Sequence, residues 1–429
     1  MRADTQTLTI RAPERRAGDA PRRIVDDLAR RSLFALFGRI TGGSIAVVEG
    51  EERFSFGATS ASLAVTITVV DPAVYRAILF GGSLGAGEAY MKGLWTCDDL
   101  VVLARILARN IDTLDAMDGG AAQLARRVMD VVAAATRRNT RAGSRRNIAH
   151  HYDLSNELFG MFLDESMMYS SAIFEREDAT LGEAQVAKLE RICQRLDLKP
   201  TDHLLEVGTG WGALAINAAR EYGCRVTTTT ISREQHRLAT ERVRAADLED
   251  RIDVLLSDYR DLRGQYSKLV SVEMIEAVGH EYMDDYFRAC GALLAPDGMM
   301  LLQAITIADQ HHDKHRKSVD FIKEYIFPGS SIPSVTSMIT STTRVTDLRL
   351  SNLEDLTPHY ARTLRVWRER FLARLSDVRR LGFDESFVRM WEYYLAYCEG
   401  AFEERYLGCV HMLFTKPKAR RELVPRRLP

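Results

Sequence analysis

The chain of 429 residues is too long for a single ordinary domain, and its 46% hydrophobic and 27% charged residues are typical of a globular protein. A formal net charge of −1 favours no particular partner, so nothing in the charge indicates nucleic-acid binding. The six cysteines form no C-x-x-C pair and no apolar run reaches about 18 residues, so we expect a reduced cytoplasmic protein without a membrane-spanning segment.

The N-terminal segment predicts a tail followed by an amphipathic helix. Residues 1–20 are polar, lack the apolar core of a signal peptide and are expected to be disordered. Pro21 can open a helix that runs to about Phe37 with its apolar residues near one face. Arg30 and Arg31 lie along this helix, where they either form a solvated face or contact anionic lipid head groups.

A small α+β domain is predicted over residues 21–118. Alternating and β-branched residues predict three strands, while apolar spacing predicts two helices, the first ending at Gly81-Gly82 and the second capped by Asp98 or Asp99. The expected strands are Ser44–Val48, Glu52–Phe56 and Ala64–Val70, and the expected helices are Ala73–Phe80 and Leu100–Arg109. Residues 119–148 start helical and become a basic linker.

Residues 149–417 predict a second domain, of the α/β class. Strands and helices alternate along most of it, which implies a parallel sheet with helices on both faces. The predicted strands are Leu204–Val207, Arg225–Ile231, Ile252–Ser257, Leu269–Met274, Met299–Ile305, Arg344–Leu348 and Cys409–Thr415, the last one antiparallel. The predicted helices are one near His151–Phe159 capped by Asp153 or Ser155, Leu181–Leu196, three starting near Arg233, Met283 and Val319, and an insertion over about Tyr360–Arg405. A basic tail, residues 418–429, follows.

The stretch Leu204–Ala215 predicts a buried strand, a tight glycine turn and the start of a helix. Gly208, Gly210 and Gly212 remove side chains where the backbone turns sharply and a ligand can approach, and the helix aims its first amides at that ligand. This pattern is typical of a nucleotide-type cofactor. The Gly-x-Gly-x-Gly spacing and the carboxylate of Glu206, which could meet an ammonium group, favour S-adenosylmethionine (AdoMet), whereas a relaxed dinucleotide fingerprint leaves a nicotinamide cofactor open.

The rest of the site is expected at the carboxyl ends of the strands, where open α/β sheets bind their ligands. That rule gathers five segments around one cleft: Glu206–Gly212, Ile231–Gln235, Ser257–Asp261, Glu273–Gly279 and Gln303–Thr306.

Taken together, the motifs resemble those of the cyclopropane-fatty-acyl-phospholipid synthases. The resemblance covers about Phe37 to Pro417, and it includes the N-terminal block that separates this chain from small-molecule methyltransferases sharing only the second domain. It implies a class I AdoMet-methyltransferase sheet of the Rossmann-like type. The motifs are Gly81–Gly85, Gly87-Glu88, Tyr90, His151–Leu154, Tyr169-Ser170, Gly208–Gly212, Thr230–Ser232, Gln235, Asp258–Arg260, Glu276–Gly279, Tyr325–Gly329, Tyr360, Thr363-Leu364 and Trp367.

The resemblance implies transfer of a methylene from AdoMet to the cis double bond of a phospholipid acyl chain, through a carbocation that a bound bicarbonate deprotonates to close a cyclopropane ring. It also implies site residues. Glu276 and Tyr360 would hold the bicarbonate, with the backbone of Ile305 and the side chains of Ser171 and Gln303. The implied cofactor-binding residues are Tyr169, Ser170, Glu206, Gly208, Gly210, Gly212, Thr230, Ser232, Gln235, Asp258, Tyr259 and Arg260.

Two positions depart from the family pattern. Ser171 stands where the family usually has Cys, and Gln303 stands where it often has His. Both residues can still donate hydrogen bonds, so an anion site could survive in altered form or be weakened. If the cation loses a proton elsewhere, the product is a methyl branch with an alkene instead of a ring.

The remaining expectations concern metals, partners and other classes of function. His150 and His151 have no third ligand at suitable spacing, so no metal is expected. The resemblance implies an unsaturated phospholipid as partner, a peripheral position at the inner face of the membrane, and allows a homodimer. A nicotinamide-dependent oxidoreductase and a non-catalytic lipid-binding protein are the alternatives from other classes.

Overall fold

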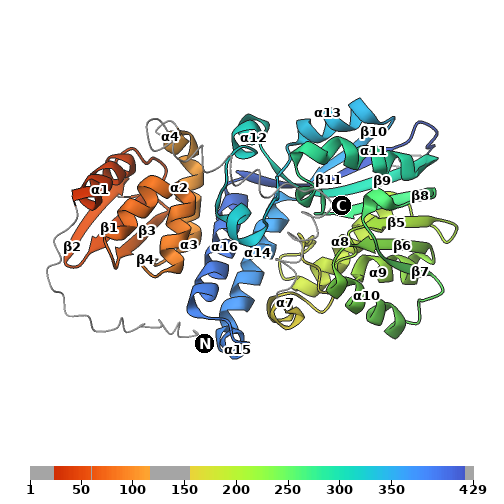
Figure 1. Cartoon of the computed structure of the whole chain (residues 1–429), viewed down its shortest axis with the longest axis horizontal. Coiled ribbons are helices and arrows are strands. Elements are labelled where there is room, and N and C mark those ends of the chain that lie inside the picture. The colour runs from red at the N-terminus through yellow and green to blue at the C-terminus, as the bar shows by residue number, and fades with distance from the viewer. Residues whose placement is uncertain (1–23, 59, 116–154, 421–429) are drawn as a thin grey trace.

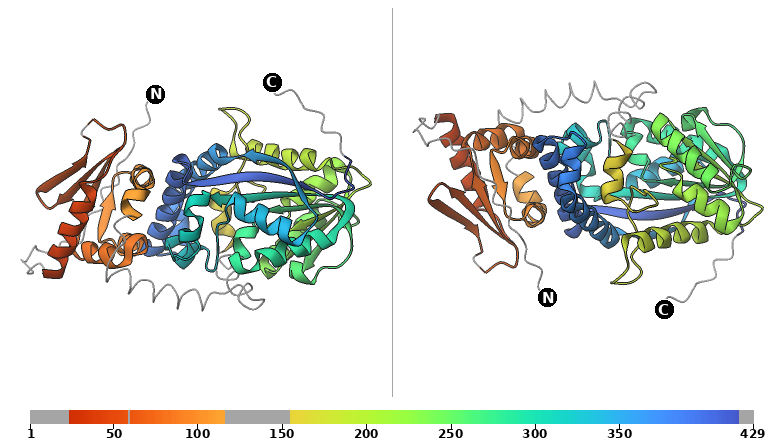
Figure 2. Two further views of the ribbon diagram at one scale, coloured as in Figure 1. Left: turned by 90° about the horizontal axis from the view of Figure 1, so that it is seen from above. Right: turned by 90° about the horizontal axis from the view of Figure 1, so that it is seen from below.

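A computed structural model describes residues 24–58, 60–115 and 155–420. Two bodies lie side by side, a small domain built from residues 24–115 and a larger one built around an extended sheet, with helices from near the C-terminus between them (Figures 1 and 2). The predictions for residues 1–20, for the linker 119–148 and for residues 421–429 of the basic tail lie outside the described residues. Within the described part, no helix is long and apolar enough to cross a membrane.

The small domain has the predicted α+β architecture. Its sheet has the order β2-β1-β3-β4, in which β1 and β3 are parallel and the other neighbours antiparallel. The elements in chain order are α1 (Ile24–Phe37), β1 (Ser44–Glu49), β2 (Glu52–Gly57), β3 (Ala64–Val69), α2 (Ala73–Met91), β4 (Trp95–Cys97), α3 (Leu100–Arg109) and α4 (Ile111–Asp115). Asp99 is the N-cap of α3, since its carboxylate accepts hydrogen bonds from the backbone N–H groups of Val101 and Val102 at 2.9 Å.

The predicted end of the second helix at Gly81-Gly82 is only partly right. Gly82 has a non-helical backbone (φ 57°, ψ −136°), so the helix does break there, but helical structure resumes and α2 continues to Met91. A positive φ costs glycine little, which is why the kink falls at this residue. The Ser83–Tyr90 motif is therefore helical.

The larger domain holds a seven-stranded sheet in the order β10-β11-β9-β8-β5-β6-β7. Strands β5 to β9 are parallel to one another, whereas β11 is antiparallel to both β9 and β10, as predicted for the last strand. The strands are β5 (His203–Val207), β6 (Arg225–Thr230), β7 (Ile252–Leu256), β8 (Tyr266–Val272), β9 (Leu294–Ile307), β10 (Arg349–Asp355) and β11 (Leu407–Thr415).

Helices cover both faces of this sheet and bury one apolar cluster on each. One cluster includes residues of α8 (Leu181–Leu196), α9 (Ala213–Tyr222) and α10 (Arg233–Ala245), and the other includes residues of α11 (Met283–Leu293) and α13 (Val335–Val345). Two shorter helices are α7 (Asn156–Phe162), capped by Ser155 as one of the two predicted candidates, and α12 (Asp309–His315).

Two sequence predictions in this domain are wrong. Arg344–Leu348 is not a strand, because Arg344 lies in the last turn of α13, which ends at Val345, and pairs with Asp284 of α11 at 2.6 Å. The strand begins only at Arg349. The helix expected near Val319 is instead a short π-helical segment, Ile322–Ile326. Both segments are short and carry mixed patterns, so their tertiary contacts decide the structure.

The predicted helical insertion forms the layer between the two domains. It consists of α14 (Thr357–Ala373), α15 (Leu375–Arg380) and α16 (Glu385–Glu403). Helix α16 packs on α14 and also on α2 and α3 of the small domain (Figures 1 and 2). Gly400 permits this close approach, because a Cβ atom there would lie 2.6 Å from the Cβ atom of Ala104 on α3.

Candidate active site

The glycine loop after β5 has the geometry expected of a cofactor cradle. Gly208, Gly210 and Gly212 all have positive φ angles, of 104°, 52° and 86°. A Cβ atom on Gly210 would have no neighbour within 4 Å, so open space lies in front of this backbone. A Cβ atom on Gly212 would lie 3.3 Å from the Cβ atom of Ala239, so this glycine lets the loop pack against α10. The loop leads directly into α9, and the fit to AdoMet rests on this open backbone.

Glu206 lies inside the sheet rather than at a free surface. It is 4% exposed, and Thr228 Oγ1 donates to its Oε2 at 2.6 Å. Burial raises the pKa of the carboxyl to about 8. The expected contact between Glu206 and an ammonium group of the cofactor therefore stays a prediction.

The next two strand ends bring together the other predicted cofactor residues. Thr230 Oγ1 donates to Gln235 Oε1 at 2.8 Å, and Ser232 caps α10 through the backbone N–H of Gln235 at 3.3 Å. After β7, Asp258 and Arg260 form an ion pair at 2.6 Å with Tyr259 between them in the sequence. These residues stand at neighbouring carboxyl ends, as the topology rule requires, and their roles remain predictions.

An aromatic cluster adjoins the loop. The ring of Tyr169 lies 5.2 Å from Trp367 and 5.3 Å from Phe159, which in turn lies 5.2 Å from Trp211 in the glycine loop. The hydroxyl of Tyr169 lies 2.8 Å from that of Tyr394 on α16. The cluster forms a largely apolar wall, of the kind that excludes water from a reacting centre.

Ser170 has a partner that the sequence did not indicate. Lys188 of α8 is fully buried, and its Nζ donates to Ser170 Oγ at 2.6 Å. Burial lowers the pKa of Lys188 to about 8, while the charge of Glu273 acts in the opposite direction. A buried cation thus stands behind the predicted methionine end of the cofactor site.

The centre of the predicted anion site is occupied by the carboxylate of Glu273. Its Oε1 accepts from the backbone N–H of Ser171 at 2.9 Å and from Gln303 Nε2 at 2.7 Å, and its Oε2 accepts from the hydroxyl of Tyr360 at 2.6 Å. Burial raises the pKa of Glu273, whereas these three hydrogen bonds and Lys188 lower it. Three of the five residues predicted to hold a bicarbonate therefore bind a carboxylate of the chain itself.

The backbone of Glu273 is strained. Its φ angle of 48° lies in the left-handed region, where a residue other than glycine costs about 1–3 kcal/mol. The side chain is held in place by donors from three distant segments, which offset this cost. Such a conformation persists only when its surroundings determine it, and it commonly marks a functional position.

Gln303 is oriented by His411 on the neighbouring strand β11. His411 Nε2 lies 2.8 Å from Gln303 Oε1, and burial lowers the pKa of His411 to about 3, so the ring is neutral. We assign the proton to Nε2, since an amide oxygen can only accept. The Nε2 amide group of Gln303 then faces Glu273, so the glutamine donates a hydrogen bond to the carboxylate.

Glu276 lies next to this arrangement but is bound differently. Its Oε1 accepts from the backbone N–H of Ile305 at 2.6 Å, while its buried Oε2 has no hydrogen-bond partner within the described chain. Burial and the neighbouring charge of Glu273 raise its pKa to about 8. The predicted pairing of Glu276 and Tyr360 around one anion is therefore replaced by two separate contacts.

The structure corrects the role expected of Ser171 and the fit of bicarbonate. Ser171 contributes its backbone N–H to Glu273, while its hydroxyl donates to the carbonyl of Ala172 at 3.1 Å. A bicarbonate would need the same donors and would face a carboxylate, so the site as folded does not fit it. Sequence reasoning missed Lys188 and His411, and it placed Glu273 in a cleft segment without giving it a role. The only available signal was a second glutamate, three residues before Glu276, directly after a strand.

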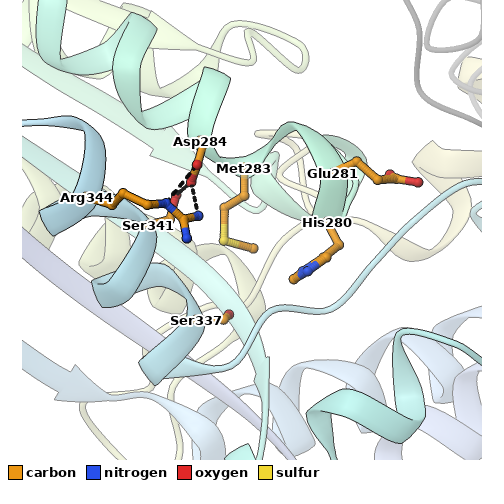
Figure 3. Close-up of a pocket in the computed structure, with 7 residues that line it drawn as sticks. All are labelled: His280, Glu281, Met283, Asp284, Ser337, Ser341 and Arg344. Atoms are coloured by element: carbon orange, nitrogen blue, oxygen red, sulfur yellow. Dashed lines mark hydrogen bonds and ion pairs between the residues drawn. The ribbon is translucent and has the colours of Figure 1, made fainter.

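A separate surface pocket does not belong to this site. It has a volume of about 240 Å³ and lies between α13 and the start of α11, where Asp284 binds Ser341 and Arg344 at 2.6 Å each (Figure 3). None of the predicted site residues lines it.

Among residues 24–58, 60–115 and 155–420, no group of three or more His, Cys, Asp or Glu side chains could hold a metal ion. His150 and His151 lie outside the described residues.

Comparison with known proteins identifies the family. A family model described as mycolic acid cyclopropane synthetase matches residues 139–412. The chain belongs to this family. The tuberculostearic acid methyltransferase UfaA1 of Mycobacterium tuberculosis is 42% identical over 78% of this chain and 79% of its own length. The cyclopropane-fatty-acyl-phospholipid synthase of Escherichia coli is 36% identical over 84% of this chain and 90% of its own length.

Solved structures support the fold of the larger domain. The cyclopropane synthase MmaA2 from Mycobacterium tuberculosis has a TM-score of 0.60 at 31% identity and covers 63% of this chain and 98% of its own. The mycolic acid cyclopropane synthase CmaA1, solved with SAH and CTAB, has the same TM-score, identity and coverage. The family members are AdoMet-dependent methyltransferases that modify lipids, which favours AdoMet over a nicotinamide cofactor for the glycine loop.

Proposed function

We propose that the protein transfers the methyl group of AdoMet to the double bond of an unsaturated phospholipid acyl chain and leaves a methyl branch with an alkene. One observation carries this proposal. Beside the glycine loop, an aromatic wall adjoins a carboxylate fixed by Ser171, Gln303 and Tyr360. The relative with 42% identity is named a methyltransferase, not a cyclopropane synthase, which supports a branch.

The two halves of the site adjoin each other. A Cβ atom on Gly208 would lie 3.3 Å from Cγ of Met274, the residue that follows Glu273. When bound, AdoMet supplies an electrophilic methyl group. The chain's residues then have three tasks: the loop holds the cofactor, the rings of Tyr169, Trp367 and Tyr360 exclude water, and their π faces stabilise a cation in the acyl chain.

Ring formation is the second candidate, because the family model and the 36% identical relative both carry the cyclopropane name. The two products differ in where hydrogen is lost and in whether an alkene remains. A ring retains two hydrogens of the transferred methyl group and no alkene. A branch beside an alkene within the acyl chain retains all three.

The test is to feed methyl-deuterated methionine to cells that express the protein and to analyse their phospholipid fatty acids by mass spectrometry and NMR. We expect an added CD₃ group together with vinylic signals, or an added CD₂ group that is itself vinylic. An added CD₂ group with cyclopropane signals would establish the second candidate. An absence of any labelled lipid would contradict both.

We also propose that α1 brings the protein to the lipid surface. Ile24, Val25 and Leu28 expose 79%, 45% and 57% of their surface. Arg31 is exposed on the same helix, but Arg30 is bound to Glu49 at 2.8 Å and is not free to contact lipid. We expect Arg31→Glu to weaken binding to anionic vesicles at low salt, and unchanged sedimentation with vesicles would contradict this.

A further inference from the structure

We propose that Glu273 is a built-in replacement for a diffusible anion, and that its carboxylate is the base that deprotonates the acyl carbocation. This inference rests on the proposed function, and it names the group that completes the reaction. The observation behind it is positional. Three of the five residues that the family resemblance assigns to bicarbonate donate to Glu273: Gln303 and Tyr360 through their side chains, and Ser171 through its backbone N–H.

All three contacts are hydrogen bonds donated to the carboxylate of Glu273. Ser171 N–H and Gln303 Nε2 converge on Oε1 at 2.9 and 2.7 Å, and the hydroxyl of Tyr360 donates to Oε2 at 2.6 Å. His411 fixes the amide of Gln303 so that its donor faces the carboxylate. Because Oε2 accepts from one donor among the described residues, it keeps a lone pair that can accept a proton.

The backbone supports the same conclusion. At φ 48° the position suits glycine, and a glycine there would leave the three donors around the space that the carboxylate of Glu273 now fills. Glutamate accepts the strained backbone and fills that space from within the chain. The carboxylate then stands at a fixed place without a second molecule having to bind.

The π electrons of the acyl double bond form the new carbon–carbon bond to the transferred methyl group, whose bond to sulfur breaks and leaves its electron pair on sulfur. The neighbouring chain carbon becomes a cation. Glu273 takes a proton from a carbon next to that cation, and the electrons of the broken C–H bond form the new double bond. The carboxylic acid returns its proton to water before the next turnover.

The test compares three variants of the full chain. Glu273→Gln keeps the shape and removes the base, so we expect turnover to fall by roughly 10²-fold or more while S-adenosylhomocysteine binds as before. Glu273→Gly suits the backbone and opens the anion space, so we expect it to be inactive in carbonate-free buffer and to regain turnover with added bicarbonate. Asp247→Gly is the matched control, because Asp247 has a φ of 55° but is exposed on the loop between α10 and the amino end of β7, whereas the site lies at the carboxyl ends of the strands.

A binding readout separates this inference from the proposed function. Bicarbonate should raise the melting temperature of Glu273→Gly but not that of the wild type or Asp247→Gly, with chloride at equal ionic strength as the reference. This result needs no turnover, so it stands even if no lipid product is found. The inference would be overturned by wild-type turnover that depends on bicarbonate, by a Glu273→Gln variant with wild-type turnover, or by equal stabilisation of wild type and Glu273→Gly. If Glu273→Gly does not fold, the turnover of Glu273→Gln decides.

Discussion

The cofactor half and the acceptor half of the site are built in different ways. The glycine loop and the ends of β6 and β7 form the cofactor half from short motifs, each contained within a strand, a turn and a helix start. The acceptor half is centred on Glu273, which binds Ser171, Gln303 and Tyr360. These three partners lie 30 to 102 residues from Glu273 along the chain. Local motifs preserve a common chemistry, whereas a centre assembled from distant segments can be rebuilt by a single substitution.

The largest expected effect lies in the cofactor half. Gly210→Val places a branched side chain in open space at a φ of 52°, so we expect the affinity for S-adenosylhomocysteine to fall by roughly 100-fold or more. Isothermal titration calorimetry measures this directly. Gly382→Val is the control, since Gly382 has a φ of 93° and equally open space away from the site. Equal affinity in the wild type and the Gly210 variant would place the cofactor elsewhere.

The acceptor half is probed by removing one hydrogen bond. Tyr360→Phe deletes the donor to Glu273 Oε2, and hydrogen bonds to charged groups contribute about 1.5–3 kcal/mol. We expect kcat to fall by roughly tenfold or more while cofactor affinity is unchanged. A parallel loss of cofactor affinity would show that the two halves are not independent.

The contact between α16 and α3 of the small domain is sensitive to side-chain size. Gly400→Ala brings a methyl group within 2.6 Å of Ala104, so we expect the free energy of unfolding to decrease by about 1–3 kcal/mol. Gly160→Ala is the control, because Gly160 lies in α7 with open space around it and alanine there should stabilise by about 0.5–1 kcal/mol. Thermal unfolding of both variants tests this, and a neutral Gly400→Ala would contradict the close approach of α16.

The pH dependence of stability tests whether Glu276 is protonated in the folded protein. Burial raises the pKa of Glu276 from 4.5 to about 8, so the folded state holds this proton more tightly than the unfolded chain. Its stabilising contribution is complete below pH 4.5 and is lost as the pH rises to about 8, by at most about 1.4 kcal/mol per pH unit. Urea unfolding at pH 5 and pH 8 should show a smaller drop for Glu276→Gln than for the wild type. An equal drop would mean that Glu276 is ionised in the folded protein.

The smallest effect is expected at Ser171. Because Ser171 reaches Glu273 through its backbone N–H, Ser171→Cys leaves that bond intact, and we expect product and kcat to change little. Lipid analysis of cells expressing the variant checks this. A switch of product from branch to ring would show that the side chain at this position selects the product.

The same division explains how much the sequence could predict. Alternation and glycine spacing located β5, β6, β7 and the loop within one or two residues, because each signal is local. Glu273 was not singled out, since its role depends on a left-handed backbone and on partners that only the fold brings near. The strand expected at Arg344–Leu348 failed for a similar reason, because the ion pair between Arg344 and Asp284 belongs to a helix pair that the local pattern does not reveal.

Helix α16 has a consequence for the way the chain is made. It lies at residues 385–403, yet it provides the surface on which the small domain of residues 24–115 packs, through Gly400 against α3 and through Glu404, which binds Arg105 and Arg109 at 2.7 Å. A ribosome delivers this partner surface only after residues 116–384 have also been synthesised. The small domain must therefore wait for α16 with one apolar face uncovered, and that interval is when a chaperone would be needed most.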